Sequence, residues 1–218
     1  GPRRTAREAK RWIAHMEQYI QDGLMPKDNY GDWCVPPEEE HLIHSNDESR
    51  KTSGEVLGTT YFIYDLKLMA KYATMLGHAD DAARYVAQAQ AMADAFNKKY
   101  WNAEKGYYAN GSQTAQVLPL YFDIAPAEAE GPAFDHLVKK IMVEGKGHIG
   151  TGLVGGQWLM RTLSDRGRAD VAYMIATQTD YPSWGYMIGQ GATTIWELWN
   201  GNTADPAMNS HNHVMLVG

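Results

Sequence analysis

A glutamate between two tryptophans is the acid in this sequence best suited to catalysis. Glu197 lies in the segment Trp196-Glu197-Leu198-Trp199, which carries little other charge. A carboxylic acid in apolar surroundings retains its proton more readily than one in water, and this property suits general acid or base work. A solvated or ion-paired glutamate on a short helix is the alternative, and the residues alone leave both interpretations open.

Other tryptophans also lie beside polar or glycine residues rather than on helix faces. Trp33 follows Asp32, and Trp184 lies between a serine and a glycine. An aromatic ring packs against the C–H face of a sugar, while a neighbouring carboxylate accepts hydrogen bonds from the sugar hydroxyls. The pattern therefore favours a carbohydrate site. Tryptophans that only cover the ends of a helix bundle are the alternative.

Several other kinds of site find little support. Cys34 is the single cysteine, which excludes an internal disulfide and a cysteine-cluster metal site. The acidic loop over residues 38–48 contains metal-ligand types, but a solvated loop is the simpler interpretation. The glycine-rich stretch 150–156 lacks a Walker lysine and a preceding strand, so nucleotide binding is rejected. We therefore predict neither a metal nor an organic cofactor.

The composition is typical of a packed domain that does not bind nucleic acid. The 218 residues are 44% hydrophobic, and 26 acidic against 20 basic side chains give a net charge of −6. Net acidity without a basic block argues against nucleic-acid binding, and no apolar run approaches the ~20 residues that cross a bilayer. The charged N-terminal segment differs from a signal peptide, and the pattern indicates neither a compartment nor an oligomeric state. We expect a fragment at both ends.

Helical periodicity dominates the chain. It predicts helices over residues 4–21, 52–77, 80–99, 112–122, 127–144, 155–164 and 167–178, and short helices from residues 191 and 208. Thr52 and Glu55 have the spacing of a capping box, Gly77 is expected at a helix C-terminus, and Pro119 predicts a kink or an early end. The stretch 145–156 is predicted as a loop, and 178–188 as a turn with extended structure.

The order of these elements predicts the fold class. Only about three residues connect the helices predicted at 52–77 and 80–99, so these two should be antiparallel neighbours. Strand patterns are few, and a parallel sheet finds no support. Helical hairpins in series then indicate an α/α toroid or a solenoid, and the lack of a fixed repeat disfavours the solenoid. The long polar loop over residues 26–52 is expected to be functional.

Seven segments together resemble a known family, the bacterial α-L-rhamnosidases of glycoside hydrolase family 78. The segments are Tyr30-Gly31-Asp32-Trp33 and residues 57–77, 112–122, 147–156, 167–188, 191–201 and 208–213. They follow the family's order, and the stretch 167–201 is the most specific. The resemblance implies an all-α (α/α)6 barrel, incomplete here because about eight helices are predicted where the barrel has twelve. We expect residues 1–218 to be the C-terminal two-thirds of this catalytic domain.

The resemblance also implies an activity and a site. The activity is the inverting hydrolysis of terminal α-L-rhamnosides, with a rhamnose-containing carbohydrate as the partner. Glu197 matches the glutamate of the family's Thr-Ile-Trp-Glu motif, which is taken as the general base that activates water. The expected sugar contacts are Asp32, Trp33, Trp184, Trp196 and His213.

The sequence also departs from the family pattern. The family's general acid lies in an acidic loop upstream of the Gly-Asp-Trp motif, and residues 1–29 contain no such loop. Inverting hydrolysis needs two carboxyl groups ~6.5–9.5 Å apart, so we expect the chain alone to be weak or inactive. An incomplete toroid would expose core-facing aromatics and associate. A non-catalytic carbohydrate-binding helical module and another (α/α)6 glycosidase are the alternatives.

Overall fold

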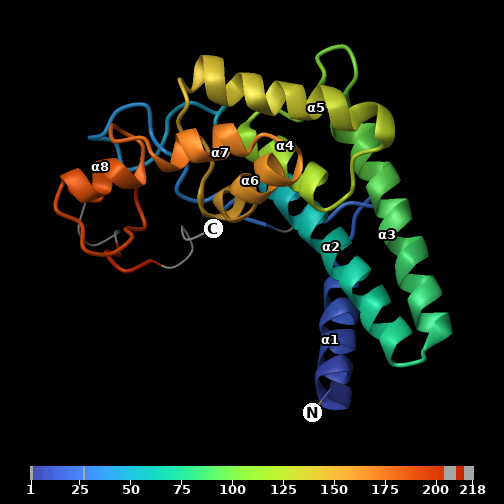
Figure 1. Cartoon of the computed structure of the whole chain (residues 1–218). Helices are drawn as coiled ribbons and strands as arrows, with labels where there is room; N and C mark the ends of the chain where they lie inside the picture. Colours follow the sequence, from blue (N-terminus) through green and yellow to red (C-terminus); the bar gives the residue numbers. More distant parts are fainter. Residues whose placement is uncertain (1, 27, 204–209, 214–218) are drawn as a thin grey trace.

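The computed structural model describes residues 2–26, 28–203 and 210–213, and these are mainly helical (Figure 1). The α-helices are α1 (Pro2–Glu17), α2 (Gly54–Met75), α3 (Ala79–Tyr100), α4 (Gln113–Tyr121), α5 (Ala127–Lys139), α6 (Leu153–Asp165), α7 (Ala169–Ala176) and α8 (Trp184–Gly189). A π-helical turn, η1 (Lys140–Glu144), extends α5, and strands β1 (Trp101–Asn102) and β2 (Tyr107–Tyr108) form a small antiparallel hairpin. None of the described helices has both the length and the apolarity to cross a membrane. The predicted all-α class is confirmed.

The helices pack as successive antiparallel pairs. α2 packs along α3, α4 against α5, and α6 against α7, while α4 also contacts both α2 and α6. Figure 1 shows α2 and α3 as a long pair on one side of the molecule and α8 on the opposite side. The first helix of each pair thus lies beside the first helix of the next, as in a ring of helical hairpins.

The start of α2 differs by one residue from the predicted capping box. Ser53 is the N-cap, and its hydroxyl accepts a hydrogen bond from the amide of Val56. Thr52 is instead buried, and its hydroxyl lies 2.7 Å from that of Ser112 at the start of α4. Thr52, which the local spacing predicts as the N-cap, therefore forms a tertiary contact with the start of α4 instead. Gly77 follows the helix with φ +76°, as predicted.

α4 is short and almost wholly enclosed. Every residue from Gln113 to Leu120 is buried, which explains why both faces of this segment are apolar or internally hydrogen-bonded. The early end predicted at Pro119 is wrong, because the helix contains this proline and continues to Tyr121, close to the predicted end at residue 122. Lys67 of α2 donates hydrogen bonds to the carbonyls of Phe122 and Asp123, both 2.7 Å, and so closes the free end of α4.

α6 begins at Leu153, inside the stretch predicted as a loop. Its glycines are needed for close packing, because a Cβ on Gly155 would lie 2.0 Å from Thr114 Oγ1 of α4. A Cβ on Gly152 would lie 2.1 Å from the carbonyl oxygen of Trp33. Glycine at these positions therefore marks helix contact rather than chain flexibility.

The C-terminal predictions are wrong in two places. Residues 184–189 form α8 instead of extended structure, because the Ser183 hydroxyl caps this helix by accepting from the amide of Tyr186. Residues 191–199 are not helical, since their backbone pairs with residues 210–213 instead. The helix predicted from residue 208 lies partly outside the described residues, and 210–213 are not helical.

The segments that precede α2, α4, α6 and α8 meet at one end of the helical pairs. The hydrogen bonds that join them link Thr52 to Ser112, Gln113 to Gly150, and Tyr181 to Pro37. Together with the bond from the Gly152 amide to Asp32, they tie the long loop 26–52 to three segments far from it in sequence. Asp32 and Trp33, two of the predicted site residues, lie on this loop.

Candidate active site

Glu197 is positioned by backbone pairing between two loop segments. Its amide donates to the Ser210 carbonyl (2.8 Å), the Ser210 amide donates to Glu197 Oε2 (3.0 Å), and the His213 amide donates to the Ile195 carbonyl (2.8 Å). This pairing places His213 Nδ1 3.8 Å from Glu197 Oε2. The side chains are 20% and 24% exposed for Glu197 and His213, so both are held in place and still reach solvent.

The remaining oxygen of this carboxylate has a different environment. Glu197 Oε1 receives no hydrogen bond from any residue that the structure describes. One oxygen of the group is thus fixed by an amide while the other can accept a proton from water. That division is what a positioned general base requires.

The tryptophans near Glu197 pack against other aromatic rings. Trp196 is buried and stacks on His211, with ring centroids 5.0 Å apart and an interplanar angle of 24°. Trp184 is half-buried and meets the fully buried Trp199 edge to face, at 5.4 Å. The two predicted sugar contacts therefore each pack against another aromatic ring, and their contact with a sugar stays a prediction.

Asp32 lies deeper than its predicted role suggests. It is only 6% exposed, and its carboxylate accepts hydrogen bonds from the Thr114 hydroxyl and from the amides of Gly152 (2.7 Å), Val154 (3.0 Å) and Gly155 (3.2 Å). These amides form the N-terminus of α6, whose unpaired donors and dipole favour a negative charge. Burial raises the pKa of Asp32, and the four hydrogen bonds oppose that rise. Protein donors thus occupy this carboxylate.

Trp33 projects from the segment that Asp32 holds. Its ring lies 5.5 Å from that of Tyr30 and 5.3 Å from that of His44, and all three line a cavity of about 230 Å³. The Trp33 carbonyl accepts a hydrogen bond from the amide of Leu153 at 2.8 Å. The Asp32 carboxylate and the Trp33 carbonyl both accept hydrogen bonds from amides at the N-terminus of α6. These bonds fix the backbone that carries the indole.

Cys34 connects this segment to the candidate base. The residue is buried with φ +60°, a left-handed conformation uncommon for a side chain with a Cβ. Burial, and then the negative charges of Glu197 and Asp32, raise the pKa of its thiol to about 12. The charges of both carboxylates therefore act on this one thiol.

The structure brings two pairs of the predicted site residues together. Glu197 and His213 are direct neighbours, and Asp32 and Trp33 line one cavity with Cys34. Sequence reasoning missed His44 as a partner of Trp33, although its proximity in the chain and its ring were a usable signal. Among the described residues, no group of three or more histidine, cysteine, aspartate or glutamate side chains could hold a metal ion.

Comparisons with known proteins identify the family of the chain. Residues 4–218 match the family model described as the bacterial α-L-rhamnosidase six-hairpin glycosidase domain. An α-L-rhamnosidase of Formosa agariphila is 34% identical over 209 residues, which cover 94% of this chain and 22% of the relative. The chain therefore spans about a fifth of the length of such relatives.

Solved structures extend the comparison to the fold. An α-L-rhamnosidase from Dictyoglumus thermophilum superposes with a TM-score of 0.88 at 34% identity, over 99% of this chain and 23% of that one. The Streptomyces avermitilis α-L-rhamnosidase complexed with L-rhamnose gives a TM-score of 0.87 at 32% identity, over 99% and 20%. The six-hairpin, (α/α)6 architecture expected from the resemblance is confirmed. The chain belongs to the bacterial α-L-rhamnosidase six-hairpin glycosidase family.

Proposed function

We propose that this chain is the C-terminal two-thirds of a catalytic domain that hydrolyses terminal α-L-rhamnosides with inversion. The observation that carries the proposal is the Glu197 carboxylate, fixed at Oε2 by the Ser210 amide and unoccupied at Oε1 by the described residues. Similarity to rhamnosidases, one of them complexed with L-rhamnose, supports the choice of sugar.

In the proposed reaction, Glu197 Oε1 takes a proton from a water molecule. The oxygen of that water forms a bond to the anomeric carbon, on the face opposite the departing oxygen, while the glycosidic bond breaks. The leaving oxygen receives a proton from a second carboxylic acid, and one attack from the opposite face inverts the anomeric configuration. Asp32 is unsuited to the acid role because four protein donors occupy its carboxylate. We assign the acid to a part of the longer protein outside these residues.

The sugar contacts divide into two kinds. We propose that Trp33, Trp184 and Trp196 form aromatic walls of the rhamnose site, and that His213 hydrogen-bonds either the sugar or Glu197, from which it lies 3.8 Å. Asp32 serves the site through Trp33, because it fixes the backbone that carries the indole.

The test is a Glu197→Gln variant of the longer protein that contains this chain, assayed on an aryl α-L-rhamnoside. Loss of the base should lower kcat by at least about 10³-fold while KM changes little. Azide should restore turnover by taking the place of activated water, and its product should be a glycosyl azide of inverted configuration.

Two controls make the result interpretable. Glu104→Gln removes an exposed carboxylate in the turn between β1 and β2 and should leave kcat unchanged. The 218-residue chain alone should be weak or inactive beside the longer protein. Unchanged turnover in the Glu197 variant would contradict the assignment of the base. Rhamnose binding by a longer protein that hydrolyses nothing would support a binding module instead.

A further inference from the structure

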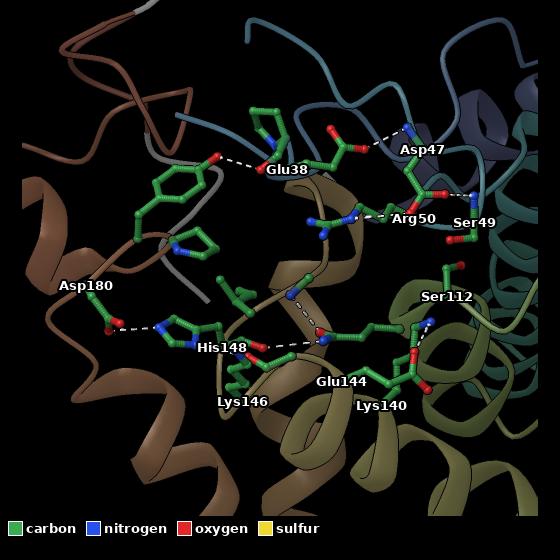
Figure 2. Close-up of a pocket in the computed structure, with 17 residues that line it drawn as sticks. Glu38, Asp47, Ser49, Arg50, Ser112, Lys140, Glu144, Lys146, His148 and Asp180 are labelled. Carbon is green, nitrogen blue, oxygen red and sulfur yellow. Dashed lines mark hydrogen bonds and ion pairs between the residues drawn. The ribbon is translucent and has the colours of Figure 1, made fainter. Parts of the chain in front are cut away.

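Residues 38–47 form a closed turn within the long loop that precedes α2. The Glu38 carboxylate accepts hydrogen bonds from the Ser45 hydroxyl at 2.7 Å and from the amides of Asn46 (3.2 Å) and Asp47 (2.7 Å). Figure 2 shows this carboxylate directed toward the backbone of Asp47. One carboxylate thus joins the two ends of residues 38–47, which we call the Glu38 turn, so that the turn is held as a unit.

The Glu38 turn reaches the cavity that Trp33 lines. His44 and Ser45 line the same cavity, and the ring of His44 lies 5.3 Å from that of Trp33. Trp33 is one of the aromatic walls proposed for the rhamnose site. The position of the Glu38 turn therefore determines which groups surround this indole.

Side chains from the C-terminal part of the chain bind the middle of this turn. Asn200 donates from Nδ2 to the carbonyls of Glu40 and Leu42, both at 2.6 Å. The Thr203 hydroxyl donates to the same Glu40 carbonyl, and the Tyr186 hydroxyl donates to the Glu40 carboxylate at 2.7 Å. Of these three side chains, only that of Asn200 bonds to Leu42 as well.

Asn200 lies three residues after Glu197 and is fully buried. Its side-chain oxygen, Oδ1, accepts no hydrogen bond from the residues that the structure describes. Burying a polar oxygen without a partner costs free energy, so the two N–H bonds to the Glu38 turn are what an asparagine contributes here. These bonds link the segment of the candidate base to the loop of the Trp33 wall.

We propose that Asn200 is a positioning residue for the rhamnosidase reaction. It fixes the Glu38 turn, and through His44 the surroundings of Trp33, relative to the segment that carries Glu197. This proposal rests on the proposed function, because Trp33 and Glu197 are taken to act on the rhamnose. The Glu197 carboxylate is itself held by the Ser210 amide and not by Asn200. Loss of the Asn200 bonds should therefore weaken sugar binding and leave the base in place.

The test is an Asn200→Asp variant of the longer protein, assayed on an aryl α-L-rhamnoside. Aspartate is close to asparagine in shape, but its carboxylate donates no hydrogen bond and turns negative oxygens toward two carbonyls. KM and the Kd of L-rhamnose, measured by calorimetry, should each rise about tenfold, while kcat should change by less than about threefold. Asn102→Asp adds the same charge in the β1–β2 hairpin and keeps the bond that Oδ1 accepts from the Lys105 amide, so it should change none of these constants.

A double-mutant cycle with His44→Ala tests the route by which Asn200 acts. If Asn200 acts through His44, then Asn200→Asp should raise KM by less than about threefold in a protein that already carries His44→Ala. Thermal unfolding reports whether each variant is folded. Thr203→Val removes an exposed hydroxyl that donates to the Glu40 carbonyl, so it should fold and raise KM about threefold with kcat unchanged. This variant decides the question if Asn200→Asp does not fold.

Hydrogen exchange of the longer protein separates this proposal from the reaction on which it rests. Peptides that contain residues 38–47 should exchange about tenfold faster in Asn200→Asp, and peptides of α3 should exchange at the unmodified rate. Unchanged exchange of the Glu38 turn, or independent effects of the Asn200 and His44 substitutions on KM, would overturn the positioning role even if aryl rhamnosides are cleaved. A kcat more than about tenfold lower at constant KM would also overturn it, since Asn200 would then act on the base. Faster exchange of the turn in a longer protein that cleaves no rhamnoside would count against the rhamnosidase reaction alone.

Discussion

Three consecutive residues, Asp32 to Cys34, have three different environments. Asp32 is buried against α6, Trp33 lines a cavity, and the buried thiol of Cys34 experiences the negative charges of Glu197 and Asp32. The left-handed backbone at Cys34 turns the chain immediately after the tryptophan. The backbone that carries the Trp33 indole is therefore fixed by a buried carboxylate on one side and turned by Cys34 on the other.

The reactivity of the Cys34 thiol should depend on its burial and on the negative charges of Glu197 and Asp32. With a pKa of about 12, only about 10⁻⁴ of it is thiolate at pH 8, against about 0.2 for an unperturbed thiol of pKa ~8.5. Labelling by a thiol reagent should be at least about 10³-fold slower in the folded chain than in urea, and should rise about tenfold per pH unit up to pH 11.

The same labelling measures how close Glu197 is. Glu197→Gln removes a negative charge that raises the pKa of the Cys34 thiol, so its thiolate fraction and labelling rate should rise. The Glu104→Gln control should label at the rate of the unmodified chain. Equal rates in all three proteins would show that Glu197 and Cys34 are not neighbours.

At the scale of elements, α6 depends on side chains from outside itself. Its first amides are capped by Asp32 from a distant loop, and its glycines let it approach α4. A helix N-terminus without such a partner leaves several buried donors unsatisfied. The loop and the helix therefore hold each other in place.

Asp32→Asn should destabilise the chain by about 3 kcal/mol, because a neutral amide offers one acceptor oxygen to four donors and turns an N–H₂ toward others. Urea denaturation measures the loss. Asp165→Asn, an exposed substitution at the other end of α6, should change stability by less than about 0.5 kcal/mol. Similar effects of the two substitutions would show that Asp32 does not cap the helix.

Two glycine-to-alanine substitutions should have opposite signs. Gly155→Ala places a Cβ 2.0 Å from Thr114 Oγ1, so α4 and α6 must separate, at a cost of about 1–3 kcal/mol. Gly131→Ala in α5 meets nothing within 4 Å and should stabilise the protein by about 0.5–1 kcal/mol through helix propensity. Thermal unfolding of both variants decides whether the α4–α6 contact is as tight as described.

At the scale of the whole molecule, most helices share one apolar core, and α1 lies at its margin. Figure 1 shows α1 meeting α2 at one end and projecting away from the shorter helices. Ile13 of α1 is only 2% exposed and belongs to the core cluster, whereas Glu17 forms an exposed ion pair with Arg84 of α3. Apolar burial should therefore attach this helix far more strongly than the charges do.

Ile13→Ala should lower the free energy of unfolding by about 2–4 kcal/mol. Arg84→Gln should lower it by less than about 1 kcal/mol, because the ion pair with Glu17 is exposed and screened by water. Urea denaturation of the two variants compares them directly. A larger loss for the arginine variant would mean that α1 is held electrostatically.

The sequence by itself determined the helices with strong amphipathic patterns, the α2–α3 hairpin, the family, and Glu197 as the candidate base. These properties reside in neighbouring residues: periodicity over a few turns, a three-residue connection, or a short motif. The prediction for α3 began and ended within one residue of the structure for the same reason. The role assigned to Glu197 stays a prediction.

Only the tertiary structure decided the start of α6, the irregular path of residues 191–199 and the partners of Asp32. Those partners lie 82 to 123 residues from Asp32 in sequence. They therefore cannot be predicted from the local spacing of residues. The polar cavity shown in Figure 2, of about 570 Å³, was equally hidden, because its lining comes from four separate segments of the chain. Burial and long-range hydrogen bonding override local propensity wherever buried amides need an acceptor.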